Sequence, residues 1–112
     1  MLIEEVIRNY LIEMLPNVKI ETEQPSGTPE SYIVFRVIDR SVTNYINAAT
    51  VEFYCYGKSK YQAAELDETL RVVLPEIIHY TDIFSCRNGG GNDDKDDSLK
   101  RYRYRSYYNM TF

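Results

Sequence analysis

The stretch Leu99–Phe112, LKRYRYRSYYNMTF, decides how this chain folds. It places Arg101, Arg103 and Arg105 on one parity of the sequence. The opposite parity carries aromatic and apolar side chains, namely Tyr102, Tyr104, Tyr108, Met110 and Phe112. Side chains on a β-strand point alternately to opposite faces, whereas a helix would mix the two classes. The stretch therefore predicts a long strand whose aromatic face packs on a core and whose arginines face outward.

The segment before this strand, Asn88–Asp97, reads NGGGNDDKDD and contains no apolar residue. This composition predicts a mobile Gly/Asp loop over residues 88–98, which follows a short strand at Ile83–Asn88. A weak cation site is an alternative, because hard cations prefer oxygen ligands. Its donors would be Asn92, Asp93, Asp94, Asp96 and Asp97. The spacing is not that of an EF-hand, so we expect a solvated charge run and no bound metal.

Periodicity further upstream predicts two amphipathic helices. The first covers Leu2–Leu15 and ends at Pro16. The second begins at Ser59, which with Gln62 matches a capping box. In this second helix, Ala63, Leu66, Leu70 and Val73 form the expected buried stripe. Four charged side chains are expected to face water: Glu65, Asp67, Glu68 and Arg71.

Alternating apolar residues predict strands at Val18–Glu23, Tyr32–Ile38 and Ile46–Tyr56, with a polar turn at Asp39–Tyr45. The predicted order is therefore α-β-β-β-α-β-β. This order is typical of an α+β fold, a mostly antiparallel sheet with two helices packed on one face. At 112 residues the chain is expected to form a single domain over residues 1–112.

Composition narrows the classes of function. The chain has 17 acidic and 13 basic residues, and its net charge of −4 argues against a general nucleic-acid binder. No stretch approaches the length of an apolar membrane span, so we expect no membrane partner. Cys55 and Cys86 are widely spaced, which favours reduced thiols in a cytosolic compartment.

No group of residues predicts catalysis or a cofactor. His79 is the only histidine, and no ligand lies at zinc-site spacing from it. The glycines Gly89–Gly91 lack the Lys-Ser/Thr that follows a phosphate-binding loop. We therefore expect a protein that is not an enzyme and that carries no cofactor.

The outward arginines leave three alternatives open. They can pair with acids on a neighbouring strand, contact nucleic acid, or contact another subunit. Tyr54 and Tyr56 also lie on the outward parity of their strand, and the chain contains eleven tyrosines. Exposed tyrosines among charged residues are typical of an interface. The predicted subunit interface comprises Arg36, Glu52, Tyr54, Tyr56, Arg101, Arg103 and Arg105.

The order of these parts resembles the tail terminators of bacteriophages and prophages, also described as head–tail joining, minor tail or minor capsid proteins. The similar parts span nearly the whole chain, and the joint Tyr56-Gly57-Lys58-Ser59 is the most distinctive. Behind this joint stand Ala63, Ala64 and Leu66. The other parts are the helix Leu2–Pro16, the strand and Pro-rich turn Ile20–Pro29, the strand Tyr32–Val37, the Gly/Asp loop and the Arg-Tyr-Arg-Tyr strand.

This resemblance implies a ring, typically a hexamer, that stops growth of the tail tube and binds the tail-tube protein and the head connector. It implies a virion protein of the tail, made in the cytoplasm of a bacterial host. DNA would pass through the bore without specific binding. An acidic segment suits such a bore, because like charge lowers affinity for phosphate. The predicted lumen or docking loop therefore contains Asp93, Asp94, Asp96 and Asp97. The alternatives are a head–tail stopper protein, or a nucleic-acid-binding module that uses the arginine strand.

Overall fold

The computed structural model of this chain describes residues 2–22, 31–43, 45–96 and 101–112, with the backbone alone at 92–96 and 101. Its elements follow the predicted order α-β-β-β-α-β-β, and the predicted α+β fold is confirmed. They are α1 (Ile3–Met14), β1 (Lys19–Glu21), β2 (Tyr32–Thr43), β3 (Ile46–Gly57), α2 (Lys60–Val73), a 3-10 helix (Leu74–His79), β4 (Ser85–Asp96) and β5 (Arg101–Thr111).

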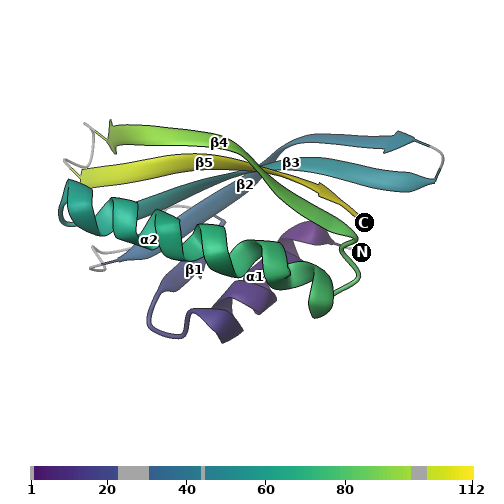
Figure 1. The fold of residues 1–112 in the computed structure, drawn as a ribbon, viewed down its shortest axis with the longest axis horizontal. Coiled ribbons are helices and arrows are strands. Elements are labelled where there is room, and N and C mark those ends of the chain that lie inside the picture. Colours follow the sequence, from purple (N-terminus) through teal and green to yellow (C-terminus); the bar gives the residue numbers. More distant parts are fainter. Residues whose placement is uncertain (1, 23–30, 44, 97–100) are drawn as a thin grey trace.

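The five strands form one sheet in the order β1-β2-β3-β5-β4. The pair β1–β2 is parallel, and the other three pairs are antiparallel. Both helices lie on one face of this sheet, and the strands twist strongly as they cross it (Figure 1). The hydrophobic core fills the space between the helices and the sheet. We call the opposite side, which no described helix or strand covers, the open face.

Strand β5 follows the predicted alternation. Tyr108 and Met110 are fully buried against the helices, and Tyr104 and Phe112 pack at the border of the core. In the adjacent strand β3, Phe53 pairs with Ser106 on the same helix-facing side. The arginines therefore lie on the open face, because antiparallel strands keep opposite residues on one side of a sheet.

The joint between β3 and α2 depends on local hydrogen bonds and on one glycine. The backbone N–H of Gln62 donates to Ser59 Oγ at 3.2 Å, and its side chain accepts from the backbone N–H of Lys58 at 3.0 Å. A Cβ atom at Gly57 would lie 2.8 Å from the backbone nitrogen of Ala63. The helix can therefore begin close to the strand only if this residue is glycine.

One expectation for α2 is wrong. Asp67 is only 2% exposed, although we expected it to face water with its charged neighbours. Its position lies between Ala63 and Leu70 on the helix surface, so it falls inside the buried stripe. We had predicted an exposed side chain from its polarity alone.

None of the described helices is long and apolar enough to span a membrane.

The predicted polar turn at Asp39–Tyr45 is also wrong in extent. Strands β2 and β3 continue as a paired hairpin, in which Asp39 lies opposite Thr50 and Thr43 opposite Ile46. Tyr45 has a φ of 67°, in the left-handed region that tight hairpins use. The arm, residues 38–43 and 45–50, projects beyond the body (Figure 1). Backbone hydrogen bonds hold this arm together without alternating apolar side chains. The apolar alternation therefore ends before the strand does, and the sequence pattern underestimates the length of β2.

The predicted loop is wrong over residues 88–96, which belong to β4 and pair with β5. A Cβ atom at Gly91 would lie 2.6 Å from the carbonyl oxygen of Arg105, so glycine lets the strands approach closely. Gly90, at a φ of 124°, adjoins a bulge in the register. The strand forms through backbone hydrogen bonds to β5, although its side chains show no apolar alternation. Asp97 lies outside the described residues.

Candidate interaction surface

Most of the residues that we predicted at an interface lie together on the open face. The strand register aligns Arg36, Glu52 and Tyr107 in one row across the sheet. The row beside it contains Val34, Tyr54 and Arg105. A third row contains Tyr32, Tyr56 and Arg103. The open face therefore brings arginines and tyrosines from three strands side by side.

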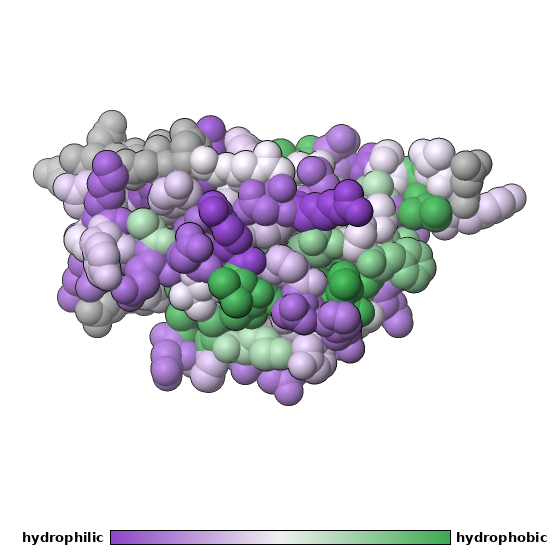
Figure 2. Space-filling view, viewed as in Figure 1, coloured by the Kyte–Doolittle hydropathy of each residue, from purple (hydrophilic) through white to green (hydrophobic). Residues whose placement is uncertain are grey.

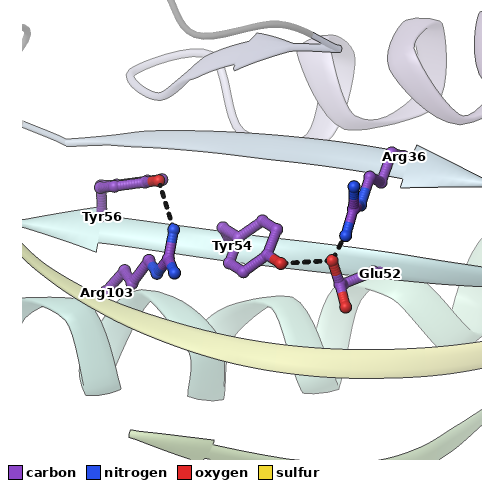
Figure 3. Close-up of polar contacts among 5 residues, drawn as sticks. All are labelled: Arg36, Glu52, Tyr54, Tyr56 and Arg103. Atoms are coloured by element: carbon purple, nitrogen blue, oxygen red, sulfur yellow. Dashed lines mark hydrogen bonds and ion pairs between the residues drawn. The ribbon is translucent and has the colours of Figure 1, made fainter. Parts of the chain in front are cut away.

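Glu52 is the centre of a polar network on this face (Figure 3). Its carboxylate accepts a hydrogen bond from Arg36 Nε at 3.0 Å and another from the Tyr54 hydroxyl. Burial on its own would raise the pKa of Glu52, but these two hydrogen bonds, the Arg36 charge and the nearby Tyr107 hydroxyl together outweigh it, and the pKa is lowered. The carboxylate is therefore held ionised although the residue is only 3% exposed.

Arg103 and Arg105 are held by aromatic neighbours. The guanidinium of Arg103 lies 4.5 Å from the centre of the Tyr54 ring and donates to the Tyr56 hydroxyl at 3.2 Å. Arg105 lies 5.4 Å from the centre of the Tyr107 ring. The two contacts with the Tyr54 and Tyr107 rings are cation–π interactions, in which arginine occurs more often than lysine. In Figure 3 the Tyr54 ring separates the Glu52 carboxylate from the Arg103 guanidinium.

Two of the predicted interface residues are less exposed than we expected. Glu52 and Tyr56 have the outward parity, but each is only 3% exposed. Tyr56 stacks on Tyr32 with ring centres 4.4 Å apart. These residues therefore position their neighbours. Among the predicted residues whose side chains are described, the accessible ones are Arg36, Tyr54, Arg103 and Arg105.

Backbone pairing between β4 and β5 brings the acidic segment next to the arginine-bearing strand. The register places Asp94 opposite Arg103 and Asp96 opposite Arg101, whereas Asp93 is opposite Tyr104. Opposite charges at cross-strand positions stabilise a sheet. The alternative of acids on a neighbouring strand is thus supported by register for these positions, and by a direct ion pair for Arg36 and Glu52.

Sequence reasoning missed two features of this surface. Tyr107 shares the parity of the arginines, so aromatic and cationic groups occur on one face even within β5. The arm was missed as well, because residues 39–45 were assigned to a polar turn, although residues 46–50 were correctly predicted as strand. Its exposed apolar side chains include Val42 at 67% and Tyr45 at 99%, and apolar surface is visible at the arm in Figure 2.

Other reactive groups do not form a site among the described residues. No three His, Cys, Asp or Glu side chains of that part of the chain are grouped as metal ligands. Burial raises the pKa of the Cys86 thiol to about 12 and also raises that of Cys55. Both thiols are therefore protonated and unreactive near neutral pH. His79 lies on the surface, 3.4 Å from Glu76.

No protein-family model and no curated protein sequence matches this chain.

Proposed function

We propose that this chain is a structural subunit of a phage or prophage tail. Copies of it assemble into a ring, typically a hexamer, that terminates the tail tube and joins it to the head connector. The observation that carries the proposal is the open face, where tyrosines and arginines gather without cover from any described element. Proteins rarely leave such a surface to solvent unless a partner covers it.

The state of these side chains supports an interface. Arg103, Arg105 and Tyr54 are already held by contacts within the chain, so little conformational entropy is lost when a partner binds. Tyrosine and arginine are also the residue types that most often contribute large binding energies. A preordered Tyr/Arg surface fits a structural subunit better than it fits a flexible tether.

The acidic end of β4 suits the bore of the proposed ring. Asp93, Asp94 and Asp96 lie on the same hairpin, and the sequence adds Asp97. A bore that carries negative charge repels the phosphates of DNA and lets it pass. In this proposal the tip of the β4–β5 hairpin faces the lumen or docks on the connector.

Native mass spectrometry across a concentration series tests the assembly. We expect a closed species near six copies, and a chain that remains monomeric at every concentration would contradict self-assembly. Arg103→Glu should raise the midpoint concentration of assembly about tenfold, because it places an acid beside Tyr54 at the contact surface. Lys58→Glu, an equal charge change at the exposed β3–α2 joint, is the matched control.

Nucleic-acid binding remains the second candidate, because Tyr54 and Tyr107 lie on the same face as Arg103 and Arg105. Aromatic and cationic groups on one face can stack on bases and hold phosphates. Against this, the arginine charges lie on the rings of these tyrosines, and the chain is net acidic. Titration with single-stranded DNA at several salt concentrations separates the two, since phosphate binding weakens steeply with salt.

A further inference from the structure

The sheet has two backbone edges that no described strand occupies. On one side, β1 covers only Tyr32–Val34, so the outer edge of β2 is unpaired over residues 35–43 among the described strands. On the other side, β4 is the last strand of the sheet over its whole length, Ser85–Asp96. An exposed edge presents a row of backbone donors and acceptors that can pair with another chain.

The two edges are compatible in direction. Strand β2 is antiparallel to β3, β3 to β5, and β5 to β4, so β2 and β4 run in opposite directions. If two copies lie side by side in the same orientation, β4 of one copy meets β2 of the next as an antiparallel pair. Such a contact uses a different surface on each copy and can be repeated around a ring.

The two edges are also compatible in charge. One row of the register runs through Asp39, Thr50, Asn109 and Arg87. Pairing at the same level therefore places Arg87 of one copy opposite Asp39 of the next, with both on the open face. Both residues are exposed, and within the described part of the chain neither forms an ion pair.

The shapes of the edges agree with this alignment. Two rows beyond Asp39 and Arg87, and again on the open face, the alignment places Ser41 opposite Ser85, and both residues are small. Each edge also has one irregularity, at Ile38 in β2 and at Gly89 in β4, and the two differ by one row. The two strands therefore depart from regular register at nearly the same level, and a bulge is a place where a strand bends.

We propose that the outer edge of residues 85–91 in β4 of one copy pairs with the free edge of residues 35–41 in β2 of the next, so that the sheets of successive copies join side by side. Residues 92–96 of β4 take no part in this pairing, because β1 already pairs with Tyr32–Val34 at their level. This inference rests on the proposed ring, and it specifies which surfaces close it. The occupant of each edge is a second copy of this chain. Ile38 and Val42, exposed by 45% and 67% along the β2 edge, add apolar contact to the backbone pairing.

Charge exchange tests the pairing. Arg87→Asp and Asp39→Arg each place like charges opposite one another, and each should raise the midpoint concentration of assembly about tenfold. The double variant, Arg87→Asp with Asp39→Arg, should restore it. Glu65→Arg, an equal charge change on the exposed surface of α2, is the control and should leave assembly unchanged.

Mixing the two single variants gives a sharper result. In an equimolar mixture, each interface between an Arg87→Asp copy and an Asp39→Arg copy carries opposite charges. Rings of alternating subunits should therefore form at concentrations at which neither variant assembles alone. A dimer that pairs β4 with β4 would not respond to the change at Asp39. Failure of the mixture to assemble, while the wild type does, would overturn the edge pairing.

Hydrogen exchange separates this inference from the proposed function. On assembly, the outward-pointing backbone amides of residues 35–41 and 85–91 should become protected at least about tenfold. A ring that forms without this protection overturns the edge pairing alone and leaves the ring function standing. A wild type that remains monomeric overturns both.

Discussion

Glu52 shows how a single buried charge can order an uncovered face. Burial of a carboxylate is unfavourable, yet Arg36 and Tyr54 both donate to it and its pKa is lowered. The folded state thus prefers the ionised form more than the unfolded state does. By linkage, this stabilisation is present above the unfolded pKa, about 4.3, and is lost as the pH falls through the lower folded value.

We predict that Glu52→Gln lowers the free energy of unfolding at neutral pH by about 2 kcal/mol, because it weakens two charge-assisted hydrogen bonds. Urea unfolding at pH 7 and at about pH 3 measures the effect, and the difference from the wild type should shrink at the lower pH. Glu65→Gln, on the exposed side of α2, is the control. An unchanged difference at both pH values would contradict the prediction.

Asp67 has the opposite effect on stability. Its burial raises its pKa, which the nearby Ser106 hydroxyl and the Arg71 charge only partly offset, while Glu68 raises it further. One of its carboxylate oxygens has no hydrogen-bond partner among the described residues. The pKa of Asp67 is higher in the folded state than in the unfolded state. Ionised Asp67 therefore destabilises the fold progressively as the pH rises from the unfolded pKa to the folded pKa.

We therefore predict that Asp67→Asn raises the free energy of unfolding at neutral pH by about 1 kcal/mol. The substitution also removes the ion pair with Arg71, at 3.6 Å. Its loss lowers the stability only slightly, because the pair is partly exposed. Thermal unfolding from pH 4 to pH 8 provides the measurement, and the gain should be largest at the alkaline end. A variant that is less stable than the wild type at pH 8 would show that Asp67 is well solvated or paired.

Individual residues were predictable where alternation was strict. Arg103 and Tyr108 were correctly assigned to opposite faces, because a side chain on a strand can point to only one of the two faces of the sheet. The face of Glu52 was also predicted correctly, but the burial of Glu52 and of Asp67 could not be predicted, since it depends on neighbours from other elements. Polarity predicts exposure only when no hydrogen-bond partner is available inside the fold.

At the scale of elements, β4 is the strand that composition conceals. We predict that Gly91→Ala lowers the free energy of unfolding by about 2 kcal/mol, because a methyl group there would collide with the Arg105 carbonyl. Chemical denaturation of the purified variant measures this. If residues 88–96 were a loop, the change would be neutral. Gly91→Ser should cost at least as much, because its side chain is larger.

The elements that the sequence predicted share a clear periodicity. The first helix, the start of the second helix and β3 were predicted close to their observed bounds, because a buried stripe or alternation extends over each of them. The extensions of β2 to Thr43 and of β4 to Asp96 carry no such pattern. They are held by backbone hydrogen bonds to a partner strand, which local sequence does not reveal.

At the scale of the whole molecule, the arm contributes surface and little core. We predict that the double change Val42→Thr and Ile46→Thr alters the stability of the monomer by less than about 0.5 kcal/mol, because both side chains are exposed. The same change should weaken assembly, which sedimentation velocity measures. Val72→Thr, an equally exposed position on α2, is the control. A loss of monomer stability with unchanged assembly would show that the arm supports the fold instead.

The position of β5 between β3 and β4 has a consequence for how the protein is made. Its contacts join residues far apart in the chain, such as Thr50 and Asn109, which are 59 residues apart. While the ribosome is still translating Arg101–Thr111, β3 and β4 cannot be joined, and α2 has no Tyr108 or Met110 to pack against. Long-range pairing is slow, and unfinished sheets aggregate readily. The nascent chain is therefore exposed to aggregation until β5 emerges, so slower expression at lower temperature should increase the yield of folded protein.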